Sequence, residues 1–456
     1  MNLINDSTIQ MILNMNTEAY LVGGAVRDYL LGKTTYDKDI IVQNAKQFAE
    51  FFSKKYNRGV IPLDEENHIY RIVLEDKLNY IDITEPINGS LIEDLKRRDF
   101  TINSIALNLK TNEIIDINNG RDDLRNGIIR TISENNIIDD PLRILRAYRF
   151  AATLGFEIED NTLEQINKHL DKIRLSAVER INYELLKLFN GRYTSTVLLQ
   201  AEKLIDILYP IFKDVKKVPP NTHHHLGLYE HSVETVNQIQ RLYETSDDRI
   251  KTHLDSIDFG GFSRLTHLKL AGFMHDIGKY SCWTIEGDRH RFIKHDDVGA
   301  KMAQSILKQN KFSKKQIEYI SSMIKNHIYP SQVVASENLN DKIYMRYIRK
   351  MGSNVIDNII LAKADRLSAL GPAITQEVIQ ENISNLDKLL NFYLSIKDKL
   401  VPLQKLLSGT EIMELKSISP SPLLGEIIKA LEQEQQEGNI QTKEAAVEFI
   451  INYKLR

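Results

Sequence analysis

The sequence is poor in cysteine, because Cys282 is the only one among 456 residues. A single cysteine excludes a disulfide within the chain and is typical of a protein kept in a reducing compartment. No run of about 18 consecutive apolar residues occurs, which predicts that no helix spans a membrane. Residues 1–7 also lack the basic start and the long apolar segment of a secretory signal. We therefore expect a cytoplasmic protein without a membrane anchor.

The chain also lacks a strong excess of charge of either sign, because its formal net charge is −3. A protein that is not basic overall can contact nucleic acid only through a local cluster of basic side chains. Apolar residues make up 42% of the chain, which is enough for a hydrophobic core. A length of 456 residues predicts two or more domains.

The most informative segment of the sequence combines a pair of glycines with a pair of acidic residues. Side chains alternate along a strand, so an Asp-x-Asp pair on a strand points to one face. Two carboxylates on one face can hold divalent cations such as Mg²⁺, which proteins bind through a few carboxylates and substrate phosphates. Glycine lets the backbone approach a polyphosphate, and arginine binds phosphate. The segment therefore predicts a nucleotidyl-transfer site, with these residues in order: Gly23, Gly24, Arg27, Asp37 and Asp39.

Four further polar motifs follow within the first 190 residues. One ends directly before a predicted strand, one reads as an acidic turn containing glycine, and one begins a helix at Pro141 with Asp139 or Asp140 as the candidate cap. That helix carries arginines at spacings of three, which places them near one face. The motifs are Arg97–Asn103, Asp116–Leu124, Asp139–Arg143 and Ser176–Glu184, and the helical arginines are Arg143, Arg146 and Arg149.

The chain alternates helices and strands up to about residue 130 and reads as helical from Pro141 onward. We therefore predict an α/β head followed by all-α domains. The predicted domains are a head at 1–138, a helical neck at 139–215, a histidine-rich helical domain at 216–375 and a helical tail at 376–456. The predicted strands are Ala19–Val22, Asp39–Val42, Ile69–Leu74, Tyr80–Ile83, Ser104–Leu109 and Ile114–Ile117.

At this point the first 200 residues closely resemble the class II tRNA nucleotidyltransferases, a family of CCA-adding enzymes and bacterial poly(A) polymerases. Five family motifs occur in the expected order, with one departure: Asp139 stands where the family usually has glutamate. The resemblance implies a polymerase-β-like head that transfers CMP and AMP from CTP and ATP to the 3′ end of tRNA. It implies no protein partner and no membrane.

The same resemblance implies roles for individual residues. Asp37 and Asp39 would hold the catalytic Mg²⁺, and Asp82 is a candidate third carboxylate, although a plain polar strand residue is the more common reading. A carboxylate and a guanidinium can together read the edge of a base in a closed pocket without a template. The implied nucleotide-binding residues are Gly23, Gly24, Arg27 and Arg98 for the triphosphate, Asp99 and Asn103 for the ribose, and Asp140 and Arg143 for the base. Arg146 and Arg149 are candidates for nucleotide or RNA contact, with a structural helix face as the equal alternative.

A second group of chemistry-bearing residues lies between residues 223 and 365. Imidazole and carboxylate side chains suit a divalent or transition metal, and an adjacent His-Asp pair supplies two neighbouring ligands. The order of these residues resembles the HD phosphohydrolase domain, which implies a divalent metal of unknown identity and a phosphatase, 2′-nucleotidase or cyclic phosphodiesterase activity. The implied ligands are His231, His275, Asp276 and Asp365, with His295 and His327 as possible additions. The triplet His223-His224-His225 falls in a predicted loop, which favours an exposed or outer role.

Three alternatives remain open on the sequence. Only 58 positions separate Asp39 from Arg97. In the family, a flexible loop before the second motif accompanies the switch from C to A, and a short gap favours an enzyme that adds only CC. A poly(A) polymerase would share the same head. In the third alternative, the protein is mainly an HD metal phosphohydrolase acting on RNA ends; conversely, the HD region could be a scaffold without hydrolytic activity.

Overall fold

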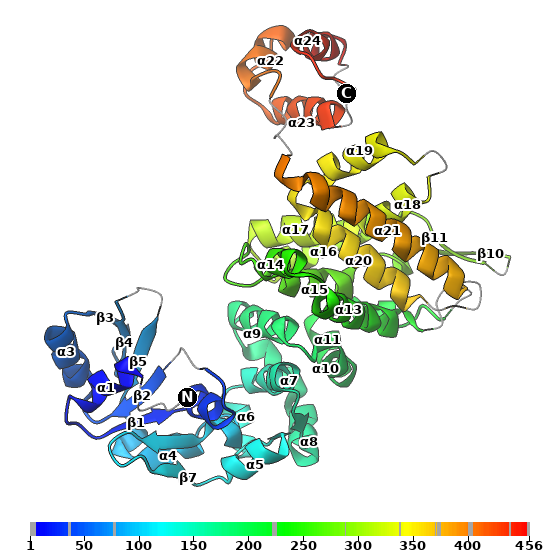
Figure 1. The fold of residues 1–456 in the computed structure, drawn as a ribbon. Helices are drawn as coiled ribbons and strands as arrows, with labels where there is room; N and C mark the ends of the chain where they lie inside the picture. The colour runs from blue at the N-terminus through cyan, green and yellow to red at the C-terminus, as the bar shows by residue number, and fades with distance from the viewer. Residues whose placement is uncertain are drawn as a thin grey trace. The chain divides into compact units, whose positions relative to one another are not determined.

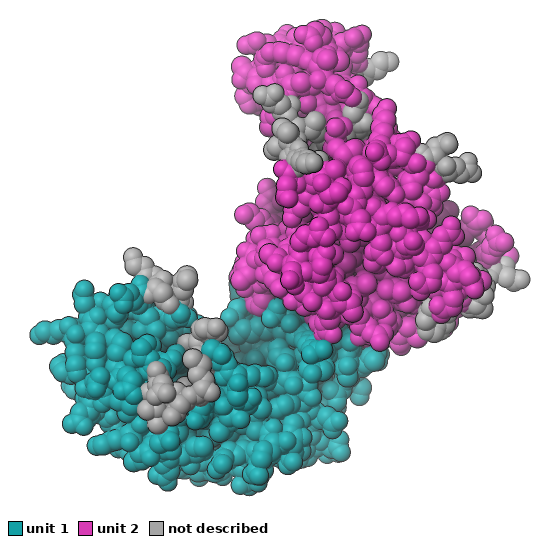
Figure 2. Space-filling view, viewed as in Figure 1, with its two compact units in different colours: residues 1–208 teal, residues 209–456 magenta. Residues whose placement is uncertain are grey.

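The computed structural model describes residues 6–34, 38–75, 79–220, 226–287, 289–336, 339–369, 371, 375–399, 405–436 and 439–453. The chain divides into two compact units, residues 1–208 and 209–456, which are coloured separately in Figure 2. Helices and strands alternate in the first unit, whereas helices dominate the second (Figure 1). No helix in the described part of the chain is long and apolar enough to cross a lipid bilayer.

A mixed sheet, which has seven strands in the described residues, organises the first unit. The strand order is β3-β4-β5-β2-β1-β6-β7; β2 and β5 are parallel, and the other neighbours are antiparallel. The strands are β1 (Ala19–Val22), β2 (Lys38–Val42), β3 (Gly59–Asp64), β4 (Ile69–Val73), β5 (Tyr80–Thr84), β6 (Ile105–Asn108) and β7 (Ile114–Asp116).

One face of this sheet is covered by α4 (Leu91–Lys96), whose Leu95 is fully buried in a cluster with Val22, Ile41 and Ala106. Alternation along β2 puts Asp39 on the same face as Ile41, two residues nearer the start of the strand. Because α4 ends beside this face, the chain that leaves it passes close to Asp39.

The residue between the two acids of the first motif turns to the opposite face of the sheet. Lys38 is buried, and its Nζ lies 3.2 Å from Oδ2 of Asp6. Asp6 also caps α1 (Ser7–Leu13) by accepting hydrogen bonds from the backbone of Thr8 and Ile9. The ion pair between Lys38 and Asp6 therefore links β2 to the N-terminus of α1 on the face of the sheet opposite Asp39.

Helices complete the first unit. The helix that follows Pro141 ends at Gly155, which has a φ of 75° and forms a left-handed cap. The helices are α2 (Gly24–Leu30), α3 (Ala45–Tyr56), α5 (Gly120–Asn126), α6 (Glu134–Asp139), α7 (Leu142–Leu154), α8 (Asp160–His169), α9 (Val178–Asn190), α10 (Thr194–Gln200) and α11 (Glu202–Leu208), with short 3₁₀ turns at Ile87–Gly89 (η2), Thr101–Asn103 (η3) and Leu170–Leu175 (η4) and a two-strand pair β8 (Ile128–Ile129) and β9 (Glu157–Ile158).

The second unit is built mainly from helices around α13, α15 and α20. Phe212 stacks on Phe273 with ring centroids 4.4 Å apart, and Tyr229 meets Phe273 edge-on, so aromatic rings fill part of this core. The helices are α12 (Phe212–Val215), α13 (Leu228–Thr245), α14 (Asp248–Asp255), α15 (Arg264–Met274), α16 (His295–Gln309), α17 (Lys314–Asn326), α18 (Tyr329–Val334), α19 (Asp341–Met351), α20 (Val355–Ser368), α21 (Gln376–Ile396), α22 (Gly409–Lys416), α23 (Pro422–Gln436) and α24 (Lys443–Asn452), with 3₁₀ turns at Tyr280–Cys282 (η5), Gly352–Asn354 (η6) and Lys397–Lys399 (η7).

One β-hairpin interrupts this helical unit. It consists of β10 (Trp283–Glu286) and β11 (Arg289–Phe292), with Trp283 paired opposite Phe292. The prediction of helices throughout residues 216–375 was wrong here. Gly287, with a φ of 60°, supplies the left-handed turn position that joins two short strands.

The predicted fold class, an α/β head followed by helical domains, is confirmed. All six predicted strands are present, and no strand end differs from its predicted position by more than one residue. Strand β3 was missed, because it is an exposed edge strand whose sequence contains Pro62 and lacks alternation. The division into four domains, with its three boundaries, remains a prediction.

Candidate active site and candidate metal centre

A pocket of about 400 Å³ opens in the first unit, where the sheet, α7 and α9 contribute side chains. Cationic side chains outnumber carboxylates among the described residues that line it, which suits a polyanionic ligand. Its lining consists of Gly23, Gly24, Arg27, Asp39, Arg98, Asp99, Asn103, Asp140, Arg143, Arg146, Arg149, Phe150, Arg180 and Lys187.

Asp39, Gly23 and Arg98 meet at one end of this pocket. Asp39 is exposed at the start of β2. A Cβ on Gly23 would lie 2.9 Å from Nη1 of Arg98 and 3.4 Å from Oδ2 of Asp39. Gly23 also has a φ of 70°, which side-chain-bearing residues rarely adopt. Glycine is therefore required here on two grounds, and it lets a guanidinium and a carboxylate approach one stretch of backbone.

A hydrogen-bonded network runs along the floor of the pocket. Nη1 of Arg27 donates to Oδ1 of Asn103 at 2.8 Å, and Nδ2 of Asn103 donates to Oδ1 of Asp99 at 3.0 Å. Nε and Nη2 of Arg146 donate to Oδ2 of Asp99 at 2.9 and 2.5 Å. Burial alone would raise the pKa of Asp99, but the charge of Arg146 and these hydrogen bonds outweigh it and lower the pKa to about 2.

Glu184 on α9 extends this network to a second arginine. Its Oε1 lies 3.2 Å from Nη1 of Arg146, and its Oε2 accepts from Nε of Arg149 at 2.9 Å. The guanidinium of Arg149 lies 3.5 Å from the centre of the Phe150 ring. Burial lowers the pKa of Arg149 to about 10, although Glu184 opposes this shift. The contacts of Arg146 and Arg149 support the structural alternative that the sequence left open.

Asp140 and Arg143 lie one helical turn apart at the start of α7. The N-cap of α7 is Pro141, without a side-chain capping hydrogen bond, so the expectation that Asp139 or Asp140 caps this helix was wrong. Oδ1 of Asp140 accepts a hydrogen bond from the backbone N–H of Leu142 at 3.3 Å. Oδ2 of Asp140 accepts from Nη2 of Arg180 at 2.9 Å. The guanidinium of Arg143 donates to the carbonyl oxygens of Arg97 and Arg98 at 2.8 and 3.4 Å.

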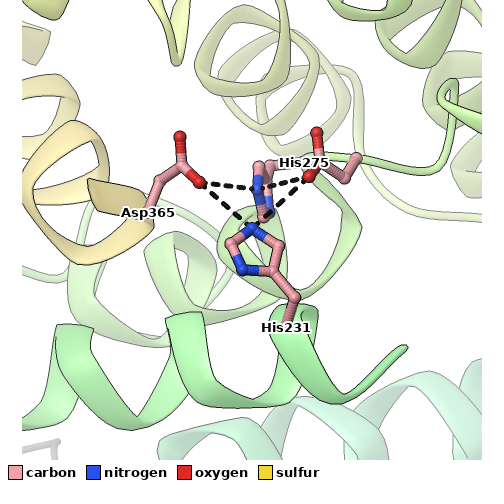
Figure 3. Close-up of side chains that lie close together, drawn as sticks. His231, His275 and Asp365 are labelled. Atoms are coloured by element: carbon pink, nitrogen blue, oxygen red, sulfur yellow. Dashed lines mark hydrogen bonds and ion pairs between the residues drawn. The ribbon is translucent and has the colours of Figure 1, made fainter. Parts of the chain in front are cut away.

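Histidines and aspartates converge in the core of the second unit. His231, His275 and Asp365 point toward one another from separate segments, as Figure 3 shows, and Nε2 of His231 lies 3.1 Å from Oδ1 of Asp365. Among the described residues, two groups could hold a metal ion, and each has all its ligand atoms within 4.8 Å of one another. Both include Asp276: one consists of His231, His275, Asp276 and Asp365, and the other of Asp276, His295 and His327.

The backbone orients three of these imidazoles. The Nδ1 atoms of His275, His295 and His327 lie 2.6 to 2.8 Å from carbonyl oxygens, which directs each Nε2 toward the cluster. His295 reaches the cluster because Gly278 has no side chain: a Cβ there would lie 2.2 Å from the carbonyl oxygen of His295. The glycine after the His-Asp pair is therefore a packing requirement.

The charges of this cluster suit a cation. Burial would raise the pKa of Asp276 and of Asp365, but the surrounding histidines hold both pKa values well below their usual range. Burial lowers the pKa of His327 to about 4, so this ring is neutral and keeps a lone pair. Burial also opposes protonation of His275, but Asp276 and Asp365 raise its pKa to about 10. Nε2 of His275 lies 3.1 Å from Oδ2 of Asp276 and 3.5 Å from Oδ1 of Asp365. A cation bound by these residues would take the place of the proton on this nitrogen.

Family models match most of the described chain. Residues 19–130 match the Poly A polymerase head domain, residues 155–216 match the probable RNA and SrmB-binding site of polymerase A, and residues 228–370 match the HD domain. The A-adding tRNA nucleotidyltransferase of Deinococcus radiodurans is 29% identical over 95% of this chain and 94% of its own. The CC-adding tRNA nucleotidyltransferase of Thermus thermophilus is 29% identical over 96% of this chain and 94% of its own.

The chain belongs to the class II tRNA nucleotidyltransferases. It carries a fused HD domain in addition to the family's head and RNA-binding region. Among solved structures, the Thermotoga maritima CCA-adding enzyme in complex with tRNA has the same fold, with a TM-score of 0.56 and 21% identity over 97% of this chain and 92% of that one.

The structure brings most of the sequence-predicted family residues together. Every predicted nucleotide-binding residue lines the pocket with Asp39. Two predictions, Asp37 and the triplet His223-His224-His225, lie outside the described residues. Asp82 lies opposite Asp39 on β5 but does not line the pocket.

Four residues at or beside the pocket were not among the predicted site residues. Phe150, Arg180 and Lys187 line it, and Glu184 holds two of its arginines. Arg180 and Glu184 belong to the fifth motif, whose spacing of four placed them on one helix face but gave no indication of their partners. In the metal cluster, Lys279 is a similar case: its Nζ lies 2.6 Å from Oδ2 of Asp276.

Proposed function

We propose that this protein adds CMP and AMP, from CTP and ATP, to the 3′ end of tRNA to complete a CCA end. The observation that carries the proposal is that one pocket holds Asp39, Gly23 and Arg98 at one end and Asp140 and Arg143 at another. A nucleoside triphosphate has the same division, with phosphates at one end and a base at the other.

At the phosphate end, Asp37 and Asp39 would hold Mg²⁺, which stabilises the attacking and leaving oxygens of an in-line displacement when it is bound. The donor set fits, because Asp39 is an exposed carboxylate beside Arg98 in a pocket rich in cations. Arg98 and the backbone of Gly23 and Gly24 would hold the triphosphate. The primer 3′-hydroxyl then attacks the α-phosphate, and pyrophosphate leaves.

At the base end, Asp140 would accept a hydrogen bond from the amino group of C or A, and Arg143 would donate to the acceptor beside it. U and G present a carbonyl where C and A present the amino group, so either would leave the carboxylate facing an acceptor. Asp99 and Asn103 would face the ribose. Their hydrogen bonds to Arg146 and Arg27 would keep them in place.

A primer-extension assay tests this function. The substrates are a tRNA transcript that ends before CCA and one that ends in CC, each supplied with CTP alone, ATP alone or both. We expect CTP alone to extend the first transcript by two residues, and ATP to add a single residue after CC. Addition of many A residues to either transcript would instead identify a poly(A) polymerase, and no extension by any nucleotide would refute the proposal.

A second candidate function, addition of CC only, is favoured by the 58 positions between Asp39 and Arg97. Two full-length relatives are named as a CC-adding and an A-adding enzyme, so partial activities occur among close relatives of this chain. The same assay decides: an enzyme of this kind stops after two C residues when CTP and ATP are both present and leaves the CC-ending transcript unchanged.

We also propose a metal-dependent phosphohydrolase activity for the HD domain, acting on phosphate esters at RNA ends. His231, His275, Asp276 and Asp365 would hold a divalent metal, which activates water for attack on phosphorus when it is bound. Lys279 would hold the carboxylate of Asp276 in place. The test is release of phosphate from a tRNA with a 2′,3′-cyclic or 3′-phosphate end, with metal content measured in parallel. We expect Asp276→Asn to lose both metal and hydrolysis; hydrolysis that persists without metal would refute this activity.

The protein would act in the cytoplasm, where tRNA, CTP and ATP occur together.

A further inference from the structure

We propose that Arg180 is a positioning residue that fixes the carboxylate of Asp140 in the orientation that reads the amino group of the incoming base. This inference rests on the proposed nucleotide addition and names a determinant of its base specificity. Arg180 lies on α9, in the fifth motif, and Asp140 lies 40 positions earlier, at the start of α7.

The two base-reading residues are held in different ways. Arg143 donates to the carbonyl oxygens of Arg97 and Arg98, so backbone fixes its guanidinium. Oδ1 of Asp140 accepts a hydrogen bond from the backbone N–H of Leu142 at 3.3 Å, and Oδ2 accepts one from Nη2 of Arg180 at 2.9 Å. Among the described residues, Arg180 is the only side chain that donates a hydrogen bond to Asp140.

This arrangement matters because the carboxylate of Asp140 can accept a hydrogen bond from the base only in the correct orientation. The side chain of Asp140 can rotate about two bonds, and a rotation that breaks the contact with Arg180 changes the direction in which its oxygens point. A fixed acceptor forms a hydrogen bond only with a base that has a donor at that position. Without Arg180, we expect Asp140 to bind the amino group of the base more weakly, whereas the contacts of the enzyme to phosphate and ribose stay unchanged.

The geometry also makes the inference testable without loss of the fold. The side chain of Arg180 is 54% exposed and that of Asp140 is 30% exposed. Ion pairs this exposed contribute little to stability. Arg180→Leu is therefore expected to fold, and Arg180→Lys keeps a cation but not the geometry of the guanidinium. Arg174→Leu serves as the matched control, because Arg174 is exposed in η4 and does not line the pocket.

The test compares two nucleotides that differ only in the group that Asp140 would read. One is CTP, and the other is its analogue with 2-pyrimidinone as the base, which lacks the amino group. We expect Arg180→Leu to lower kcat/KM for CTP about tenfold through KM and to leave the analogue nearly unchanged, so the ratio of the two falls toward one. Arg180→Lys should recover part of the ratio, and Arg174→Leu should match the wild-type enzyme.

Each other result overturns the inference in a recognisable way. An equal loss for CTP and the analogue would mean that Arg180 binds phosphate or the RNA primer. A ratio unchanged from that of the wild-type enzyme would mean that Asp140 is positioned without it. Failure of the wild-type enzyme to incorporate CTP would count against the proposed function itself, and the two failures are therefore distinguishable.

Discussion

Asp39 and Asp82 are directly paired residues in the parallel ladder between β2 and β5, so their side chains leave the sheet on the same face. Their surroundings nevertheless differ. Asp39 lines the pocket beside Arg98, whereas Asp82 is held by Arg71, whose Nε and Nη2 each lie 2.8 Å from one of its oxygens. Asp39 therefore faces the pocket, whereas the charge of Asp82 is neutralised within the protein.

This difference predicts opposite outcomes for two conservative substitutions. Asp39→Asn removes a negative charge from the site of phosphate transfer and should lower the rate of CMP incorporation roughly a thousandfold, because such electrostatic stabilisation contributes several kcal/mol. Asp82→Asn should change the rate less than about threefold, since exposed or partly exposed ion pairs contribute little. Single-turnover incorporation of labelled CMP measures both. An equal loss in the two variants would show that Asp82 acts in the reaction.

Glu184 should be important for the stability of the first unit. Its side chain is 5% exposed and pairs with Arg146 and Arg149. Glu184→Ala leaves the largely buried guanidinium of Arg149 without its ion-pair partner, while Arg146 keeps Asp99, and should lower the free energy of unfolding by about 3 kcal/mol. Urea denaturation measures the change. The exposed Glu164→Ala on α8 is the control, and a similar small effect of both substitutions would contradict the prediction.

The stability of the protein should depend on pH through Asp99. The pKa of this carboxyl is lowered from an ordinary value of 3.8 to about 2 in the folded protein, because Arg146 and Asn103 outweigh the effect of burial. A group of this kind stabilises the fold above its unfolded pKa and loses that effect as the pH falls toward its folded pKa. The contribution is about 2 kcal/mol at pH 7.

The Asp99→Asn variant tests this dependence. The difference in unfolding free energy between the wild-type and variant proteins should be constant from pH 7 to about pH 5 and should shrink between pH 4 and pH 2. A difference that stays constant down to pH 2 would mean that the ionisation of Asp99 contributes nothing to stability.

A buried carboxylate on α20 should hold the second unit together independently of its metal cluster. Asp357 accepts hydrogen bonds from Nε of Arg264 at 3.1 Å, from the Tyr319 hydroxyl at 2.6 Å and from Nε2 of His253 at 2.6 Å. These partners come from three other helices. Burial alone would raise the pKa of Asp357, but His253 and Arg264 lower it.

We expect Asp357→Asn to lower the stability of the second unit by about 3 kcal/mol, because it leaves the exposed Asp258 as the remaining counter-ion of the buried Arg264. Thermal unfolding followed by circular dichroism measures the loss, and the exposed Asp248→Asn is the control. Metal bound per folded molecule should be unchanged, since Asp357 is not a member of either candidate metal group. If Asp357→Asn lost bound metal but kept the stability of the wild-type protein, Asp357 would act in metal binding rather than in stability.

Local sequence features predicted the helices and strands on which the pocket residues lie, but not the hydrogen bonds and ion pairs between those elements. Asp39, Gly23 and Arg27 share one short segment, so alternation and glycine chemistry were enough to place them. The partner of Asp140 lies 40 positions away on another helix, and Glu184 lies 38 positions from Arg146. Helical spacing identifies the face on which such residues lie, whereas the packing of one helix on another decides which of them meet.

The same limit explains the other errors. The hairpin at residues 283–292 was read as helix because its two strands are short and a single turn glycine, Gly287, decides the topology. His295 and His327 were named only as possible additions, because their approach to the cluster depends on packing between distant segments. The start of α16, which carries His295, packs against Gly278, and His327 directly follows α17, which packs against α16.

The hairpin also has a practical consequence, because it contains Trp283, the single tryptophan of the chain. The centroid of the indole ring lies 5.4 Å from that of the His290 ring, at an interplanar angle of 36°. The carbonyl oxygen of Phe292, the residue opposite Trp283, lies 2.8 Å from Nδ1 of His295, and its ring lies beneath Nζ of Lys279. Intrinsic indole fluorescence therefore originates from one defined place in the second unit. Its emission can follow titration of the HD cluster with zinc, manganese or magnesium without any attached dye.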